Sequence, residues 1–223
     1  MELSVYVYLV FIAATIATVL FLYKASGKSK AVLGVSLTWL LIQGIVSYTG
    51  FYEKIDGFPP RFALLLLPPL VLIAWLFNAD RGRAFISKFD GKWLTYLHVV
   101  RIPVEMVLFW LFVGGYVPEL MTFEGINFDI LSGITAPLIA YFGIGKSKMK
   151  KKYLMLWNFI CLGLLFNIVI NAILSAPSVF QAQAYDQPNI GVFYFPFVWL
   201  PCFIVPAVLF SHLVCLKKLK SIS

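Results

Sequence analysis

Seven long apolar stretches, separated by short polar loops, constrain this chain more than any other feature of its sequence. They cover residues 4–23, 31–50, 61–78, 93–116, 129–145, 153–176 and 191–216. A helix needs about 20 residues to cross the hydrocarbon core of a bilayer, and each stretch is close to that length. Hydrophobic residues make up 61% of the chain and charged residues only 13%, whereas soluble domains carry about 25% charged residues. The sequence therefore predicts an all-α integral membrane protein with seven transmembrane helices.

The basic residues are distributed unevenly between the loops, and this predicts how the helices are oriented. Fifteen of the 18 Lys and Arg residues follow the first, third, fifth and seventh stretches: Lys24, Lys28, Lys30, Arg81, Arg83, Lys88, Lys92, Lys146, Lys148, Lys150, Lys151, Lys152, Lys217, Lys218 and Lys220. By the positive-inside rule, the N-terminus is expected outside and the C-terminus in the cytoplasm. Topology and contact with anionic lipids account for the net charge of +8, so we expect no nucleic-acid partner.

The loops are too short to form a separate soluble domain, so residues 1–223 are expected to form one membrane domain. The first stretch lacks a preceding basic segment, which is typical of a retained helix and not of a cleaved signal peptide. The multi-pass topology suits the plasma or inner membrane of a prokaryote, where membrane lipids are partners and an oligomer is allowed.

Residues 62–77 and 195–210 can be aligned without gaps, with Pro68 opposite Pro201. Transporters often arise by duplication of a helical unit. The alignment makes a 3+1+3 parallel pseudo-repeat a hypothesis, in which helices 1–3 and 5–7 correspond and the fourth helix links them.

The fourth stretch carries a polar segment, LHVVRIPVE, at residues 97–105. On a helix, His98, Arg101 and Glu105 lie within about 60° of one another and share one face. An uncompensated charge in mid-membrane costs at least about 2.5–3.5 kcal/mol, so this face is expected to meet protein or water and not lipid. Arg101 and Glu105, one turn apart, either form an internal structural pair or build a functional site. Pro103 favours the site, because a proline leaves a backbone carbonyl without its donor.

Other polar residues extend this prediction. Within the stretches, four amides are candidates to line a central cavity: Gln43, Asn158, Asn167 and Asn171. At the predicted outer mouth, the segment TFEGINFD offers Glu124, Asn127 and Asp129, and Asp129 is also placed to cap the fifth helix. The same connection is rich in apolar residues, so we expect it to fold back onto the outer mouth.

The two histidines, His98 and His212, lie at similar depth near the cytoplasmic side. Paired histidines can ligate a haem, which makes them weak candidates for a metal site, but a hydrogen-bonded role within helices is the alternative. We predict no cofactor, and no metal.

These observations favour a small transporter or channel for an unknown small solute or ion, with a polar intramembrane site at Arg101 and Glu105. Binding of an anion to Arg101 would couple transport to proton uptake by Glu105. Established catalytic motifs do not occur in the sequence, so an enzyme is not favoured. The alternatives are a membrane sensor or assembly partner without transport, an intramembrane enzyme that uses Glu105 and His98, and a haem-binding redox protein that uses His98 and His212.

Overall fold

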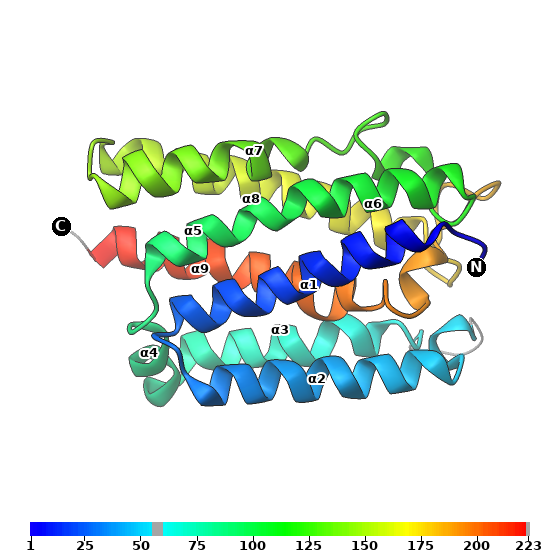
Figure 1. Ribbon diagram of the computed structural model, residues 1–223, viewed down its shortest axis with the longest axis horizontal. Helices are drawn as coiled ribbons and strands as arrows, with labels where there is room; N and C mark the ends of the chain where they lie inside the picture. The colour runs from blue at the N-terminus through cyan, green and yellow to red at the C-terminus, as the bar shows by residue number, and fades with distance from the viewer. Residues whose placement is uncertain (55–59, 222–223) are drawn as a thin grey trace.

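The computed structural model describes residues 1–54 and 60–221, and 73% of these described residues are helical. Within the described residues there are helices and loops but no β-strand. Figure 1 shows the long helices lying side by side in one elongated bundle, with the two termini at opposite ends. We call the end that carries the C-terminus and the loops at 26–29, 87–90 and 146–150 the basic end, and the opposite one the N-terminal end.

Five helical segments are long and apolar enough to cross a membrane: α1 (Val5–Ala25), α2 (Lys30–Tyr48), the unit Gly91–Val113, α8 (Lys151–Leu174) and the unit Leu200–Ser221. Gly91–Val113 consists of α5 (Gly91–Leu97), the 3₁₀-helix η2 (His98–Val100) and α6 (Arg101–Val113). Leu200–Ser221 consists of the π-helix η6 (Leu200–Ile204) and α9 (Val205–Ser221). Short 3₁₀-helices occur in three loops: η1 (Phe51–Glu53), η3 (Glu119–Met121) and η5 (Gly191–Phe193).

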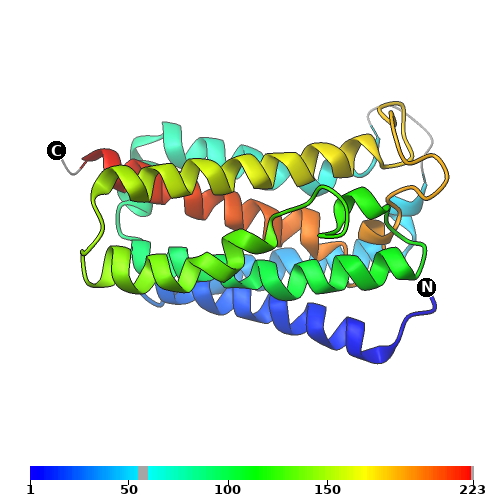
Figure 2. The same ribbon diagram turned by 90° about the horizontal axis from the view of Figure 1, so that it is seen from above.

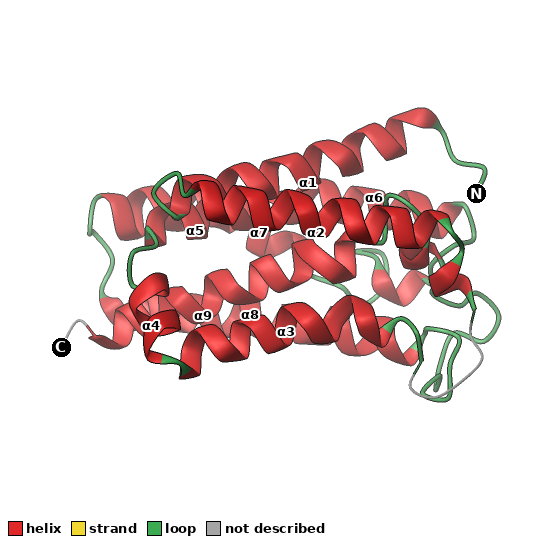
Figure 3. Cartoon of the chain, turned by 90° about the horizontal axis from the view of Figure 1, so that it is seen from below, coloured by secondary structure: helices red, strands yellow, loops and turns green. Residues whose placement is uncertain are grey.

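Two of the seven predicted stretches form helices that differ from a simple span. α3 (Ala63–Asn78) is followed by α4 (Asp80–Ile86) after a bend of 95°, and the two together would give a sixth span. Figure 3 shows α4 at the basic end, next to the end of α3. A Cβ atom at Gly82 would lie 2.6 Å from the backbone of Leu76, so the bend requires glycine there. The remaining apolar helix, formed by α7 (Ile130–Leu138) and the π-helix η4 (Ile139–Gly145), is shorter than the five.

α7 is short because of the connection that precedes it. Figure 2 shows the chain after α6 returning from the N-terminal end toward the middle of the bundle, where α7 begins. Val117, Thr122 and Asn127 of this connection are completely buried. The apolar connection thus folds back into the bundle, and α7 with η4 covers only the remaining distance to the basic end.

Prolines accompany irregular turns in three of the apolar helices. Pro103 cannot donate to the carbonyl of Val99, and the helix tightens into the 3₁₀-helix η2 just before Arg101. Pro137 lies at the end of α7, immediately before η4, and Pro201 lies within η6. The irregular turn at η2 places Arg101 at the start of a new helical segment.

Helix α7 approaches α6 closely at Gly133. A Cβ atom at this position would lie 2.8 Å from Cγ1 of Ile102 and 3.3 Å from Cβ of Arg101. Real Cβ atoms do not tolerate the first of these distances, so glycine is what allows the start of α7 to lie against Arg101.

We predict that Gly133→Ala lowers the thermal unfolding midpoint of the detergent-solubilised protein. The added methyl group overpacks the contact between α6 and α7, at about 1–3 kcal/mol. Gly163→Ala in α8 is the matched control, since a Cβ atom there meets no atom of the described chain within 4 Å. Alanine favours a helix over glycine by about 1 kcal/mol, so the control should unfold at the same or a higher temperature. Equal midpoints for the two variants would contradict the close approach of α7 to α6.

Candidate functional site

A cavity of about 80 Å³ lies beside Arg101, between α3, α6, α8 and the η6–α9 unit. Most of its lining is aliphatic or aromatic, and its polar side chains among the described residues are Arg101, Glu105, Asp129 and Asn189. A water molecule needs at least about 10–15 Å³, so the cavity has room for a few waters or one small ion.

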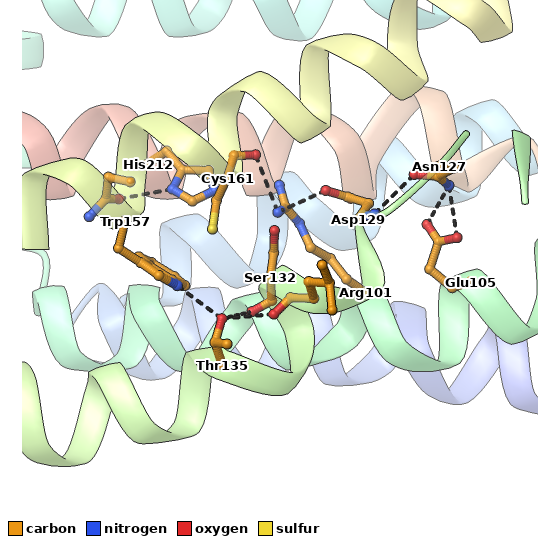
Figure 4. Close-up of polar contacts among 11 residues, drawn as sticks. Arg101, Glu105, Asn127, Asp129, Ser132, Thr135, Trp157, Cys161 and His212 are labelled. Atoms are coloured by element: carbon orange, nitrogen blue, oxygen red, sulfur yellow. Dashed lines mark hydrogen bonds and ion pairs between the residues drawn. The ribbon is translucent and has the colours of Figure 1, made fainter. Parts of the chain in front are cut away.

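Arg101 is the cation of this site. Its side chain comes from the first turn of α6, and the residue is only 2% exposed. Its Nη1 atom lies 3.0 Å from Oδ1 of Asp129, which forms an ion pair, and 3.5 Å from the carbonyl oxygen of Cys161. Figure 4 shows the guanidinium between these two groups, which belong to the start of α7 and to α8. Arg101 therefore ties three segments of the bundle together.

Glu105 lies one turn further along α6 and is held by Asn127. The side-chain amide of Asn127 donates to both carboxyl oxygens of Glu105, at 2.7 and 2.8 Å, and to the carbonyl of Met121 at 3.0 Å. The backbone N–H of Asp129 donates to Oδ1 of Asn127 at 3.1 Å, which fixes the orientation of the amide. Figure 4 shows Asn127 between Asp129 and Glu105. One asparagine thus connects the carboxyl group of Glu105 to the backbone of Asp129.

Several buried polar atoms of the site have no hydrogen-bond partner in the described part of the chain. They include Nε and Nη2 of Arg101 and Oδ1 of Asn189. Burying such groups without partners is unfavourable, and each such group calls for an explanation such as a bound water or ion. Two residues of the cavity lining, Arg101 and Asn189, thus carry two unused donors and one unused acceptor among the described residues.

The structure corrects the expected pairing of Arg101 with Glu105. The one ion pair of Arg101 within the described residues is with Asp129, on the following helix, whereas Glu105 binds Asn127. The residues predicted for the site do lie inside the bundle, because Arg101, Glu105 and His98 are between 0% and 2% exposed. The spacing of one helical turn correctly placed Arg101 and Glu105 on one face of the helix, but it did not identify the partner of Arg101.

Asn127 and Asp129 were expected at the outer mouth, and the structure places both in the connection that folds back into the bundle. Both residues are buried, and Asp129 occupies the N-cap position of α7, although its side chain accepts no capping hydrogen bond from the helix backbone. Glu124, in contrast, remains exposed at the surface of this connection. The predicted outer mouth therefore does not hold these three residues together.

The two histidines contact each other directly. The rings of His98 and His212 are stacked with centroids 3.9 Å apart, and Nδ1 of His212 lies 2.8 Å from Oδ1 of Asn158. The ring of Trp157 packs against both. The nitrogen lone pairs of a histidine lie in the plane of its ring. In two stacked rings, these lone pairs therefore cannot be directed at one iron atom between the two histidines. Axial haem ligation by His98 and His212 would require the rings to separate.

The enzyme hypothesis paired His98 with Glu105 as acid and base. Among the described residues, His98 stacks on His212 and makes no contact with Glu105.

The four amides expected to line the cavity are not among its lining residues. Each is used in a local hydrogen bond: Gln43 accepts from Tyr52 at 2.5 Å, Asn158 contacts His212, Asn167 donates to the carbonyl of Ile126, and Asn171 donates to Asn167. A buried amide is stabilised by any nearby partner, so its position on an apolar helix does not identify a cavity.

Asn189 is a site residue that the sequence did not indicate. It is 1% exposed and lines the cavity, with its backbone N–H bound to the carbonyl of Ser175 at 2.8 Å. It belongs to the long connection before η5, and neither a spacing nor a motif marks it. Only the folding of that connection over the bundle brings it near Arg101.

We predict that Arg101 is coupled more strongly to Asp129 than to Glu105. Contacting charged residues couple by about 0.5–3 kcal/mol in double-mutant cycles. Cycles of Arg101→Gln with Asp129→Asn, and of Arg101→Gln with Glu105→Gln, should give the larger coupling for Asp129. The measurement is the free energy of unfolding in mixed micelles. A larger coupling between Arg101 and Glu105 would show that the pairing within the helix is the correct one.

Comparison with known proteins places most of the chain in one family. Residues 59–220, which include the whole site, match the protein-family model described as Domain of unknown function (DUF8737). No curated protein and no solved structure matches the chain.

Proposed function

The chain belongs to the DUF8737 family, and we propose that it is a multi-pass membrane protein that carries a small anion through the bundle together with protons. The observation that carries this proposal is the cavity beside Arg101, a buried cation with two unused donors. A small transporter would need such an internal site, and the many long apolar helices suit a membrane.

The charges of the site support coupling to protons. One arginine and two carboxyl groups, those of Asp129 and Glu105, line a cavity whose wall is otherwise mostly apolar. An excess buried charge is unfavourable, and the triad is neutral only when one carboxyl group holds a proton. An anion that binds the free edge of Arg101 adds a further negative charge, so its entry is favoured when another proton accompanies it. This is the minimum requirement of a proton symporter.

We propose seven membrane crossings, with the N-terminus outside and the C-terminus in the cytoplasm. The basic end holds the C-terminus, as the positive-inside rule requires. In this arrangement α3 crosses the membrane by itself, and α4 lies at the membrane interface. α7 and η4 together cross as a short helix, which follows a re-entrant connection. The 3+1+3 pseudo-repeat and the prokaryotic plasma or inner membrane remain predictions.

We predict that labelling of introduced cysteines in intact cells follows this topology. The native cysteines Cys161, Cys202 and Cys215 are buried, so an introduced exposed cysteine is labelled selectively. Asp186→Cys should react with an impermeant maleimide added outside, whereas Lys148→Cys should react only after permeabilisation. Labelling of position 148 from outside would refute the orientation.

The transport proposal predicts anion-dependent acidification of proteoliposomes that contain a pH dye. Nitrate, bromide and chloride gradients are the probes, because these ions are small and cross bilayers slowly. Uptake should rise as the external pH falls, Arg101→Gln should abolish it, and Glu105→Gln should remove its dependence on pH.

Arg81→Gln, which changes an exposed arginine of α4, is the matched control and should transport as the wild type does. Size-exclusion profiles identify variants that fail to fold. Wild-type flux equal to that of empty liposomes for all three anions would refute transport and favour the sensor hypothesis. An unchanged pH profile in Glu105→Gln would refute only the role of Glu105 in coupling.

A further inference from the structure

A second and much larger cavity lies nearer the basic end of the bundle. It has a volume of about 630 Å³ and lies between α2, α3 and α9, with contributions from α1 and α4. Its lining is almost entirely apolar, for example Val32, Ile73 and Phe203. None of the unpartnered buried polar atoms in the described residues belongs to this lining. It therefore differs from the small cavity beside Arg101, whose lining includes residues with unpartnered polar atoms.

Trp39 lines this cavity, but its polar indole N–H is already used in a hydrogen bond. It donates to the carbonyl oxygen of Cys202 at 2.8 Å, so the ring presents its apolar surface to the cavity. Apolar cavities stay dry and bind apolar molecules, because water in them finds no hydrogen-bond partners. The volume lies within the range of about 300–1,000 Å³ that is typical of ligand pockets. The occupant is expected to be an apolar group of considerable size.

The cavity reaches the side of the bundle between α2 and α3. Three of its lining residues are largely exposed there: Val35 at 61%, Leu72 at 46% and Trp75 at 52%. In a membrane, this side faces the lipid hydrocarbon. An acyl chain can therefore enter laterally without crossing a polar region.

The end of the cavity near the basic loops carries positive charge. Ala31 and Val32 of the lining follow Lys30 directly, and Phe89 of the lining follows Lys88. Both lysines are exposed, and the backbone N–H of Asp90 donates to the carbonyl of Ala25 at 2.7 Å, which holds the two loops together. The charge suits a phosphate group at the membrane surface.

We propose that this cavity holds one acyl chain of an anionic phospholipid, whose phosphate group lies at Lys30 and Lys88. The charge at the mouth distinguishes an anionic lipid from a zwitterionic one, and the apolar lining accounts for the chain. The proposal shares the membrane location with the proposed function but does not depend on anion transport.

The test is native mass spectrometry of the full-length protein with added phosphatidylglycerol or phosphatidylcholine. The wild type should retain one phosphatidylglycerol per chain with at least tenfold preference over phosphatidylcholine. Val35→Trp fills the cavity and should lose the retained lipid. Leu41→Trp is the matched control, since Leu41 lies on the same helix, is 63% exposed and does not line the cavity, and it should behave as the wild type does.

The headgroup contact is tested by the double variant Lys30→Gln/Lys88→Gln. It should bind phosphatidylglycerol no better than phosphatidylcholine, whereas Lys148→Gln/Lys150→Gln, at exposed lysines of another basic loop, should keep the preference. Lipid retention in Val35→Trp equal to that of the wild type, or absence of a retained lipid in the wild type, would overturn the proposal. Equal affinity of the wild type for the two lipids would overturn the assignment of an anionic headgroup.

Discussion

The ion pair between Arg101 and Asp129 is the interaction on which the centre of this bundle depends. A guanidinium that is 2% exposed needs a counter-charge, because a buried charge without a partner is strongly destabilising. The carboxylate comes from the start of α7, so this helix has to begin in the middle of the bundle. The preceding connection therefore folds back, and Gly133 leaves the space that α7 needs against α6. The short α7 and the buried connection are consequences of placing one acid beside one base.

The two cavities differ in a way that suggests two different ligands. The small cavity contains a cation, two carboxyl groups and an asparagine within an apolar wall, which suits a small charged solute. The large cavity is almost entirely apolar and has lysines only beyond its end, which suits a hydrocarbon chain with a charged head. Both lie against the η6–α9 unit, where Pro201 and Pro206 interrupt regular helix geometry. This unit is the structural element common to the two sites.

The sequence predicted the helices well and the site only in part. Apolar length located the long helices but not α4, and the cost of a charge in an apolar surrounding predicted that Arg101 and Glu105 face inward. The partner of Arg101 could not be predicted, because helical periodicity relates residues on one helix and says nothing about a connection that re-enters the bundle. The apolar residues of VPELMTFEGINF indicated that this connection folds back, but not how deeply. Asn189 and the stacking of His98 on His212 depend on contacts between distant segments, which one sequence does not specify.

The central claim is that Arg101 binds a small anion inside the bundle, and anomalous diffraction from crystals grown with bromide tests it most directly. Bromide is small enough for the cavity, and its anomalous signal identifies the ion without ambiguity. We expect a peak in the cavity within hydrogen-bond reach of the Nε and Nη2 atoms of Arg101, and no such peak in Arg101→Gln. Bromide only at surface lysines, with an empty cavity beside Arg101, would contradict the claim.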